Sequence, residues 1–193
     1  MSQATQFDLS VDVGGGLRLE NPVLAASGCC GYGVELAPFY SPRLLGGLVG
    51  KTITRQPREG NDCPRMTETP AGMLNSIGLQ NPGIEAYLER LLPDMNALGG
   101  VPVVANVAGE DAEDFAELTR RVGELEGVAA IELNISCPNV SHGLNLARDP
   151  KLAEAVIRAC REKTKKPLWA KLSPNVDDVA EIAKGAEAGG ADA

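Results

Sequence analysis

Several features that would place a protein in a membrane, outside the cell or on nucleic acid are missing from this sequence. Its 193 residues contain no apolar run that approaches the ~18 residues needed to cross a bilayer. The opening residues have neither the basic nor the apolar region of a secretory signal peptide. The formal net charge is -8, so no basic surface for nucleic acid or an anionic membrane is expected. These absences predict a cytoplasmic protein without nucleic-acid or membrane partners.

Cysteine and histidine are scarce, which limits metal binding and thiol chemistry. The five cysteines, an odd number, argue against a disulfide framework, and their spacings match no zinc or iron–sulfur ligand set, so no metal site is expected. Cys160 and the adjacent Cys29 and Cys30 are expected to be packing residues, with lining of a site floor as the alternative for that pair. The only histidine, His142, lies five residues beyond Cys137, but no third residue that would orient it is visible. A Cys–His protease is therefore disfavoured.

The chain does contain five short apolar runs, each followed by polar or charged residues. The apolar runs fall at residues 22–26, 47–50, 102–105, 128–131 and 167–170. The residues at or just beyond their ends include Ser27, Gly28, Lys51, Thr52, Asn106, Asn134 and Lys171. Lysine is rarely buried without an acceptor, and ligands sit beyond the carboxyl ends of parallel strands. A solvated strand end explains any single case, whereas five in succession predict one shared binding edge.

Between these runs, apolar residues recur with helical spacing. The helical stripes cover residues 84–92, 115–125, 152–160 and 179–186. Pro93 is expected to disrupt the first helical pattern, and Asn175 is expected to cap the last helix. Ahead of the first run, residues 7–11 and 17–19 flank three glycines at 14–16 as a small hairpin. No helix or P-loop lysine follows those glycines, so a turn is favoured over a phosphate site.

The alternation of strand and helix predicts an α/β fold with a parallel sheet and right-handed crossovers. A (β/α)8 TIM barrel is favoured over an open doubly wound sheet because every strand end, rather than one switch point, carries polar side chains. A complete barrel needs ~250 residues. The chain stops at residues 189–193, where a sixth strand should begin. We therefore expect a single partial barrel domain over residues 1–193, made of the hairpin and about five βα units of the eight.

The loop after the fourth run carries the densest chemistry. Residues 134–139 read Asn-Ile-Ser-Cys-Pro-Asn and follow a run typical of a buried strand. Two carboxamides, a hydroxyl and a thiol therefore stand together at one strand end. A thiol has an ordinary pKa of about 8.5 and is a far better base near neutral pH than a serine hydroxyl. Cys137 is accordingly the candidate general base.

Other short motifs accompany this loop along the chain. They are Ala-Ser-Gly at 26–28, Lys-Thr at 51–52, Arg-Glu-Gly-Asn at 58–61, Asn-Ser-Ile-Gly-Leu-Gln-Asn at 75–81 and Lys-Leu at 171–172. In this order and spacing, from about Leu19 onward, they closely resemble class 1 dihydroorotate dehydrogenases. Residues 68–83 are most similar to the NAD-linked branch (1B), since the fumarate-linked branch usually carries a Met-Gly-Leu-Pro-Asn variant. Cysteine rather than serine at 137, and the lack of a membrane-binding extension, separate the chain from the quinone-linked class 2.

The resemblance implies an FMN-dependent enzyme that oxidises (S)-dihydroorotate to orotate in de novo pyrimidine (UMP) biosynthesis. Cys137 would be the general base, on the substrate face opposite the flavin. The implied substrate contacts are Lys51, Asn75, Ser76, Ile77, Gly78, Leu79, Asn134 and Asn139. The implied FMN contacts are Ala26, Ser27, Gly28, Lys51, Thr52, Asn106, Asn134 and Lys171. For Asn106 a turn-forming role, and for Lys171 a solvent-facing position, are the plain alternatives.

The resemblance to the NAD-linked branch also implies a partner. Hydride would reach FMN, and electrons would pass to NAD through a subunit that carries FAD and a [2Fe–2S] cluster, joined in a heterotetramer. The loop after Cys137 departs from the family, because it lacks the usual glycine pair and Phe-Gly-Thr-Asp. The strands expected to supply the FMN phosphate site lie beyond residue 193. Residues 1–193 alone are therefore expected neither to hold FMN tightly nor to turn over substrate.

Two alternatives stay open. A dihydropyrimidine dehydrogenase-like barrel that acts on uracil or thymine shares the Asn-x-Ser-Cys-Pro core, although that family usually has histidine in place of Asn139. A truncated, non-catalytic protein that only packs against a partner would need none of this chemistry.

Replacement of Cys137 by serine in the full-length protein tests the general base. Cys137→Ser should slow the reduction of bound flavin by dihydroorotate by on the order of a hundredfold or more, and it should raise the pH optimum, because serine is the weaker acid. FMN should stay bound. Stopped-flow measurement of flavin reduction across a pH series provides the check, and an unchanged reductive half-reaction would remove Cys137 from this role.

Overall fold

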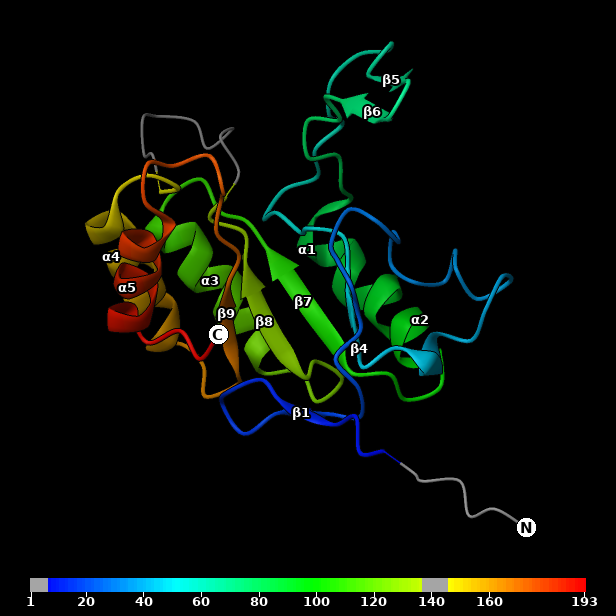
Figure 1. Cartoon of the computed structure of the whole chain (residues 1–193), viewed down its shortest axis with the longest axis horizontal. Coiled ribbons are helices and arrows are strands. Elements are labelled where there is room, and N and C mark those ends of the chain that lie inside the picture. The colour runs from blue at the N-terminus through cyan, green and yellow to red at the C-terminus, as the bar shows by residue number, and fades with distance from the viewer. Residues whose placement is uncertain (1–6, 137–145) are drawn as a thin grey trace.

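A five-stranded parallel sheet forms the centre of the computed structural model, which describes residues 7–136 and 146–193. Its strands stand in the order β3, β4, β7, β8, β9, so each pairs with the next parallel strand along the chain (Figure 1). Their bounds are Leu24–Ala25 (β3), Gly47–Val49 (β4), Val103–Val107 (β7), Ala130–Leu133 (β8) and Leu168–Ala170 (β9). The five strands predicted from the apolar runs are thus confirmed.

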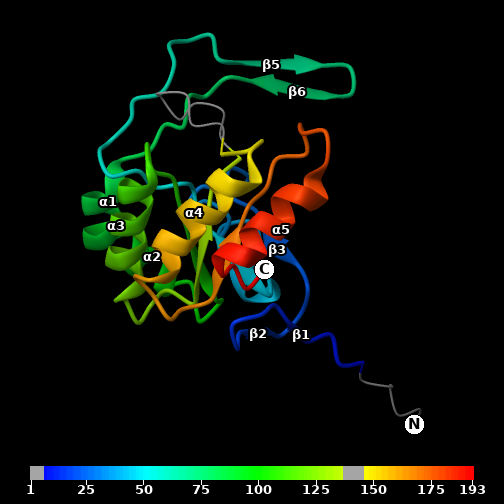
Figure 2. The same ribbon diagram turned by 90° about the vertical axis from the view of Figure 1, so that its left-hand side faces the viewer.

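Helices lie along the outer side of this sheet (Figures 1 and 2). They are α1 (Gly83–Ala86), the π-helical turn η2 (Tyr87–Leu91), α2 (Leu92–Asn96), α3 (Ala112–Gly123), α4 (Pro150–Arg161) and α5 (Val179–Gly189), with a 3-10 turn η1 at Pro42–Leu44. Successive parallel strands with helices outside are the plan of a (β/α)8 barrel, and the described residues form an open section of one. Among these helices, none is long and apolar enough to cross a bilayer.

Strand residues alternate between two apolar clusters on opposite faces of the sheet. The larger cluster joins strand residues such as Leu48, Val103 and Ile131 to the helices. The smaller, inner cluster consists of Val49, Val104, Ala130 and Trp169, with Val13 and Leu17 packed against it. These last two residues belong to the hairpin of β1 (Val11–Asp12) and β2 (Arg18–Leu19), which lies at the amino ends of the strands (Figure 1). The predicted N-terminal hairpin therefore closes the inner face from below.

The three glycines of that hairpin form a turn, as predicted. Gly14, Gly15 and Gly16 all have positive φ, at 83°, 60° and 80°. Side chains other than glycine rarely adopt this left-handed region, so the run serves a backbone turn.

Pro93 disrupts the regular α-helix, as predicted, but does not end it. The helix continues to Asn96, and a π-helical turn precedes the proline. In this wider turn the N–H of Leu92 bonds to the carbonyl of Tyr87, five residues back. The widening accommodates the proline ring, which in a regular α-helix would clash with the carbonyl four residues before it.

Asn175 does not cap the last helix; that prediction is wrong. The carboxylate of Asp178 accepts from the N–H of Ala180 at 2.8 Å, and α5 starts directly after it. The N–H of Asn175 instead bonds to Ser173 Oγ at 3.2 Å, in the turn that precedes the helix. Asn175, Asp177 and Asp178 are all residue types that can cap a helix. In the structure the helix starts after Asp178, so Asp178 is the cap.

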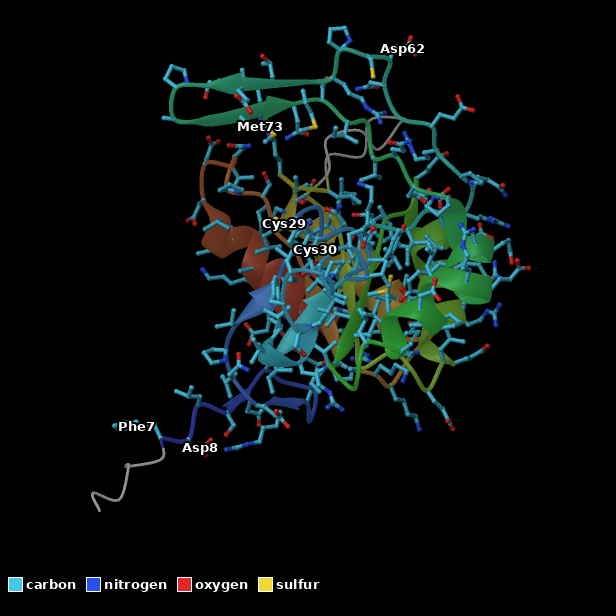
Figure 3. The ribbon with its side chains drawn as sticks, turned by 90° about the vertical axis from the view of Figure 1, so that its right-hand side faces the viewer. Phe7, Asp8, Cys29, Cys30, Asp62 and Met73 are labelled. Atoms are coloured by element: carbon cyan, nitrogen blue, oxygen red, sulfur yellow. The ribbon has the colours of Figure 1, made fainter. Side chains whose placement is uncertain are left out.

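A second hairpin, which the sequence patterns did not predict, projects from the carboxyl end of the sheet (Figures 1 and 2). Its strands β5 (Met66–Thr69) and β6 (Gly72–Asn75) pair antiparallel, and each of their residues is exposed. Since neither face is buried, no alternation of polar and apolar residues is required, and the periodicity that reveals the other strands is missing. Figure 3 shows Met73 on this hairpin above Cys29 and Cys30.

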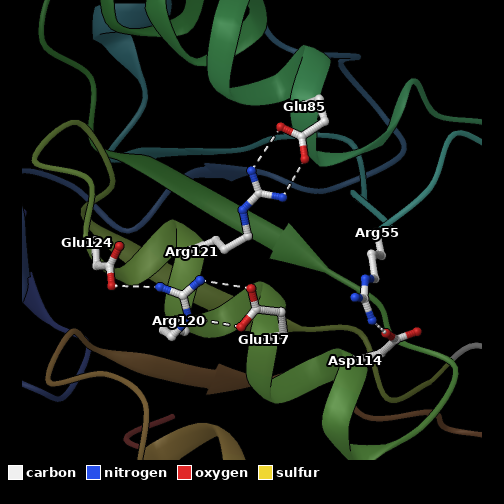
Figure 4. A network of polar contacts seen from close by, with 7 residues as sticks. All are labelled: Arg55, Glu85, Asp114, Glu117, Arg120, Arg121 and Glu124. Carbon is white, nitrogen blue, oxygen red and sulfur yellow. Dashed lines mark hydrogen bonds and ion pairs between the residues drawn. The ribbon is translucent and has the colours of Figure 1, made fainter.

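Arginine–carboxylate pairs line the solvent side of α3 (Figure 4). Arg121 makes a bidentate pair with Glu85 of α1, at 2.7 and 2.9 Å, and Arg120 pairs with Glu117 and Glu124. The hydrogen bonds from Arg121 hold the pKa of the Glu85 carboxyl below its ordinary value. Because these groups are largely exposed, we assign them orientation of α1 against α3 rather than a large share of stability.

Phe115 offers a test of how far packing of α3 stabilises the sheet. Its side chain is 0% exposed within the main cluster, whereas Phe39 is 83% exposed. Phe115→Ala in the full-length protein should lower the free energy of unfolding by about 3–5 kcal/mol, because it removes buried area and leaves a cavity. The matched Phe39→Ala should change it by less than about 0.5 kcal/mol. Denaturant unfolding measures both, and equal effects would contradict the assignment of the core.

Candidate functional site

A cavity of about 460 Å³ opens at the carboxyl edge of the sheet, beneath the projecting hairpin. Its walls are Ser27, Gly28, Cys29, Lys51, Thr52, Asn75, Ser76, Ile77, Gly78, Leu79, Asn134 and Lys171. Apart from Cys29, all of these residues were predicted to bind a ligand or cofactor. The volume is in the range of pockets for small molecules. Residues from distant parts of the chain thus reach one space, which solvated strand ends would not require.

Thr52 connects three strand ends at the floor of this cavity. Its Oγ1 lies 3.3 Å from Ser27 Oγ and accepts from Asn134 Nδ2 at 3.2 Å. Asn134 Oδ1 in turn accepts from Ser136 Oγ at 2.8 Å. Thr52 and Asn134 are buried, so this chain of bonds positions the Asn134 carboxamide within the wall.

Two lysines supply positive charge to the cavity in an otherwise acidic chain. The backbone N–H of Lys51 bonds to Gly31, in the turn after β3, at 2.8 Å. The backbone N–H of Lys171 bonds to Leu133 of β8 at 3.0 Å and extends the sheet pattern. Burial lowers the pKa of Lys51, and the nearby Arg65 guanidinium lowers it further. An anionic ligand would offset both effects, because it favours the charged ammonium.

The loop that follows β6 forms the roof. Gly78 and Leu79 both adopt left-handed backbone conformations, with φ of 75° and 56°. Leucine rarely occupies this region, so the conformation must be held by neighbouring groups. Asn61 supplies part of the support: its Nδ2 donates to Ser76 at 2.8 Å and its backbone N–H to Ile77 at 3.1 Å.

Asn81 supplies the rest and is a positioning residue that the sequence analysis did not single out. Its Nδ2 donates to the carbonyl of Leu79 at 2.9 Å. Its Oδ1 accepts from the backbone N–H of Thr54 at 3.1 Å and of Gly83 at 2.9 Å. The side chain is 5% exposed, so it joins the roof loop to the β4 and α1 segments inside the protein. Its place at the end of the Asn75–Asn81 motif was the available signal.

The remaining predicted residues lie elsewhere. Ala26 is exposed beside the cavity and does not line it. Asn106 is 0% exposed on the inner face of β7, where its Nδ2 donates to Glu132 of β8. Cys137 and Asn139 lie outside the described residues.

The two cysteines near the first strand differ in their surroundings. Cys30 is buried in the main cluster, as expected for a packing residue, and burial raises the pKa of its thiol to about 11. Cys29 is exposed and lines the cavity, so for this residue the alternative prediction is the correct one.

A neighbouring cavity of about 390 Å³ lies between residues 54–58 and the start of α3. Its arginines are already engaged, because Arg55 pairs with Asp114 at 3.1 Å and Arg58 with Glu110 at 3.8 Å. The larger cavity is the better candidate site, since its lysines, hydroxyls and carboxamides converge on one volume. Within the described part of the chain, no group of three or more His, Cys, Asp or Glu residues is arranged to hold a metal ion.

These groups suit a flat, anionic ligand with donors and acceptors along its edge. Carboxamides provide both kinds of hydrogen-bonding group, lysines provide fixed cations, and the roof loop provides backbone groups. A planar ring system held between floor and roof would meet all three.

Comparison with known proteins agrees with this chemistry. Residues 9–193 match the family model for dihydroorotate dehydrogenase. The chain is 50% identical over 179 residues to "Dihydroorotate dehydrogenase B (NAD(+)), catalytic subunit" of Desulforudis audaxviator and 47% identical over 178 residues to the protein of that name in Enterococcus faecalis. These alignments cover 92% of this chain but only 58% and 57% of the relatives, so the chain spans under three fifths of their length.

A solved structure supports the fold. The dihydroorotate dehydrogenase of Eimeria tenella, crystallised with ferulenol, superposes with a TM-score of 0.75 at 21% sequence identity. The superposition covers 100% of this chain and 60% of that one. At this identity the likeness concerns the fold alone.

Replacement of Asn81 tests the support of the roof loop. Asn81→Ala should lower the free energy of unfolding by about 1–3 kcal/mol, because the N–H groups of Thr54 and Gly83 lose their acceptor. Hydrogen exchange at Gly78 and Leu79 should become faster. The exposed Asn175 is the control, and Asn175→Ala should leave exchange in the loop unchanged. Equal exchange in the two variants would show that Asn81 does not hold the loop.

Proposed function

The chain belongs to the dihydroorotate dehydrogenase family, and from that premise we propose that the full-length protein oxidises (S)-dihydroorotate to orotate in pyrimidine biosynthesis. The supporting observation is the convergence of Lys51, Lys171 and Asn134 with the roof loop on one cavity. Dihydroorotate is a flat cyclic imide with a carboxylate, and it needs cations, donors and acceptors together.

In this proposal the substrate lies under the roof loop. Lys51 pairs with its carboxylate, and the carboxamides of Asn75 and Asn134 bond to the imide edges. Ser76, Ile77, Gly78 and Leu79 close the pocket from above. Asn139 would add a further carboxamide by its place in the family motif. Enclosure by the loop excludes water, which strengthens each of these polar contacts.

FMN is the proposed cofactor, and the residues at the floor fit its ring system. The ring has a polar edge with donors and acceptors, which Ser27, Thr52 and Asn134 match. When bound, FMN accepts the hydride from one substrate carbon. Lys171, which lines the cavity, would stabilise negative charge at the N1–C2=O edge of the reduced ring. The backbone at Ala26 and Gly28 would flank the ring, and Asn106 would support it from below.

Cys137 is the proposed general base by its place in the Asn-Ile-Ser-Cys-Pro-Asn motif. It takes the proton from the ring carbon next to the hydride-donating one, so the substrate loses a proton and a hydride to form the double bond of orotate. The motif begins at Asn134, and the place of Asn134 in the cavity wall supports this proposal.

We further propose that electrons leave through a partner subunit to NAD. The names of the relatives, catalytic subunits of an NAD(+)-linked enzyme, support this, as does the Asn75–Asn81 motif. A partner with FAD and a [2Fe–2S] cluster, joined in a heterotetramer, would carry the electrons.

A uracil or thymine reductase is the second candidate. Its substrates share the imide ring but lack the carboxylate, so Lys51, proposed to pair with that carboxylate, favours dihydroorotate over dihydrouracil.

Flavin reduction by the full-length protein separates these functions. Dihydroorotate should bleach bound flavin rapidly in stopped-flow absorbance, and dihydrouracil should not. Lys51→Met should weaken dihydroorotate binding roughly ten- to hundredfold, since a charge-assisted contact is lost. Lys163→Met, the same charge change at an exposed residue, should have no effect. Reduction by dihydrouracil alone would favour the second candidate.

The electron acceptor is tested by steady-state turnover with NAD and with fumarate, for the subunit alone and with its partner. We expect NAD reduction only in the complex. Efficient fumarate reduction by the lone subunit would contradict the assignment to the NAD-linked branch.

A further inference from the structure

Glu132 places a carboxylate on the inner face of the sheet, one residue pair below the cavity. It lies in β8 between Asn106 of β7 and Trp169 of β9, its partners in the parallel register. Asn134 directly follows β8 and Lys171 directly follows β9, and both line the cavity. Glu132 is half-buried in an otherwise apolar strand, and even partial burial of a carboxylate is costly unless it has partners.

The surroundings of Glu132 are polar and only partly satisfied. Asn106 Nδ2 donates to its carboxylate. Asn106 Oδ1 and Trp169 Nε1, buried on either side, have no hydrogen-bond partner among the described residues. Burial raises the pKa of Glu132, while the bond from Asn106 and the positive charge of Lys171 act in the opposite direction. The carboxylate thus accepts a hydrogen bond from Asn106 and interacts by charge with Lys171, which lines the cavity.

We propose that Glu132 is a positioning residue that orients Asn106 and partly offsets the charge of Lys171. The inference rests on the proposed function, since Lys171 is there assigned to the flavin edge. With Glu132 in place, the floor beneath Lys171 carries less net positive charge than the lysine alone would supply. Glu132 would therefore reduce the extent to which the site stabilises negative charge on a bound group.

The reduction potential of bound flavin provides the first test. Glu132→Gln keeps the size of the side chain and an oxygen acceptor for Asn106 but removes the negative charge. A more positive site favours reduced flavin, so the potential should rise by about 30 mV, which corresponds to a tenfold change for a two-electron couple. Glu126→Gln, the same charge change at an exposed residue, should leave the potential unchanged, and Glu132→Asp should restore it in part. A purely structural role would weaken flavin binding without raising the potential.

The second test needs neither flavin nor substrate. Infrared titration of flavin-free, full-length protein follows the carboxyl stretch of Glu132, identified by its absence in Glu132→Gln. Lys171→Met should move this titration to higher pH, because it removes a charge that lowers the pKa of Glu132. Lys163→Met should not move it.

The outcomes distinguish the two proposals. If dihydroorotate fails to reduce wild-type flavin but Lys171→Met still moves the titration, the proposed function fails and the coupling of Glu132 to Lys171 stands. If dihydroorotate does reduce the flavin, then an unchanged or lowered potential in Glu132→Gln, or an unmoved titration in Lys171→Met, overturns the inference.

Discussion

The parallel pairing of the central strands is the constraint on which the rest of this structure depends. Because β3, β4, β7, β8 and β9 all run in one direction, their carboxyl ends meet at a single edge. Residues that are far apart in the sequence, such as Lys51 and Lys171, therefore face the same cavity. At the opposite edge, Val13 and Leu17 of the N-terminal hairpin pack against the inner apolar cluster. Chemistry and stability are thus separated along the strand axis, as in barrels generally.

The inner face of the sheet is layered from apolar to polar along this axis. At the bottom, Val104 and Ala130 pack together. Two residues further along each strand, on the same face, Asn106 and Glu132 share a hydrogen bond, and above them lies the cavity. Toward the carboxyl ends of the strands, the inner face therefore carries more polar side chains that need hydrogen-bond partners. The layer of Asn106 and Glu132 belongs neither to the inner apolar cluster nor to the cavity wall.

The roof of the cavity depends on contacts outside the sheet. Its loop leaves the exposed hairpin, which buries no face of its own, and includes a leucine in the left-handed region. Asn81 and Asn61 hold that loop through bonds to the backbone. The floor is built from strand ends and the roof from side-chain-to-backbone bonds, so a rigid floor faces a roof whose geometry depends on a few polar groups.

Patterns within single elements were enough to locate the five strands, the glycine turn and most cavity residues, because each depends on local periodicity or on a contiguous motif. The sequence by itself also determined the binding edge, since parallel strands with polar ends permit only one. What only the tertiary structure decided were features set by partners elsewhere in the chain. Those are the passage of the helix through Pro93 over a widened turn, the cap at Asp178, the projecting hairpin, and the roles of Asn81 and Glu132. Hydrogen bonds and charge interactions between different elements leave no periodic pattern in the sequence, so they can be identified only in the packed structure.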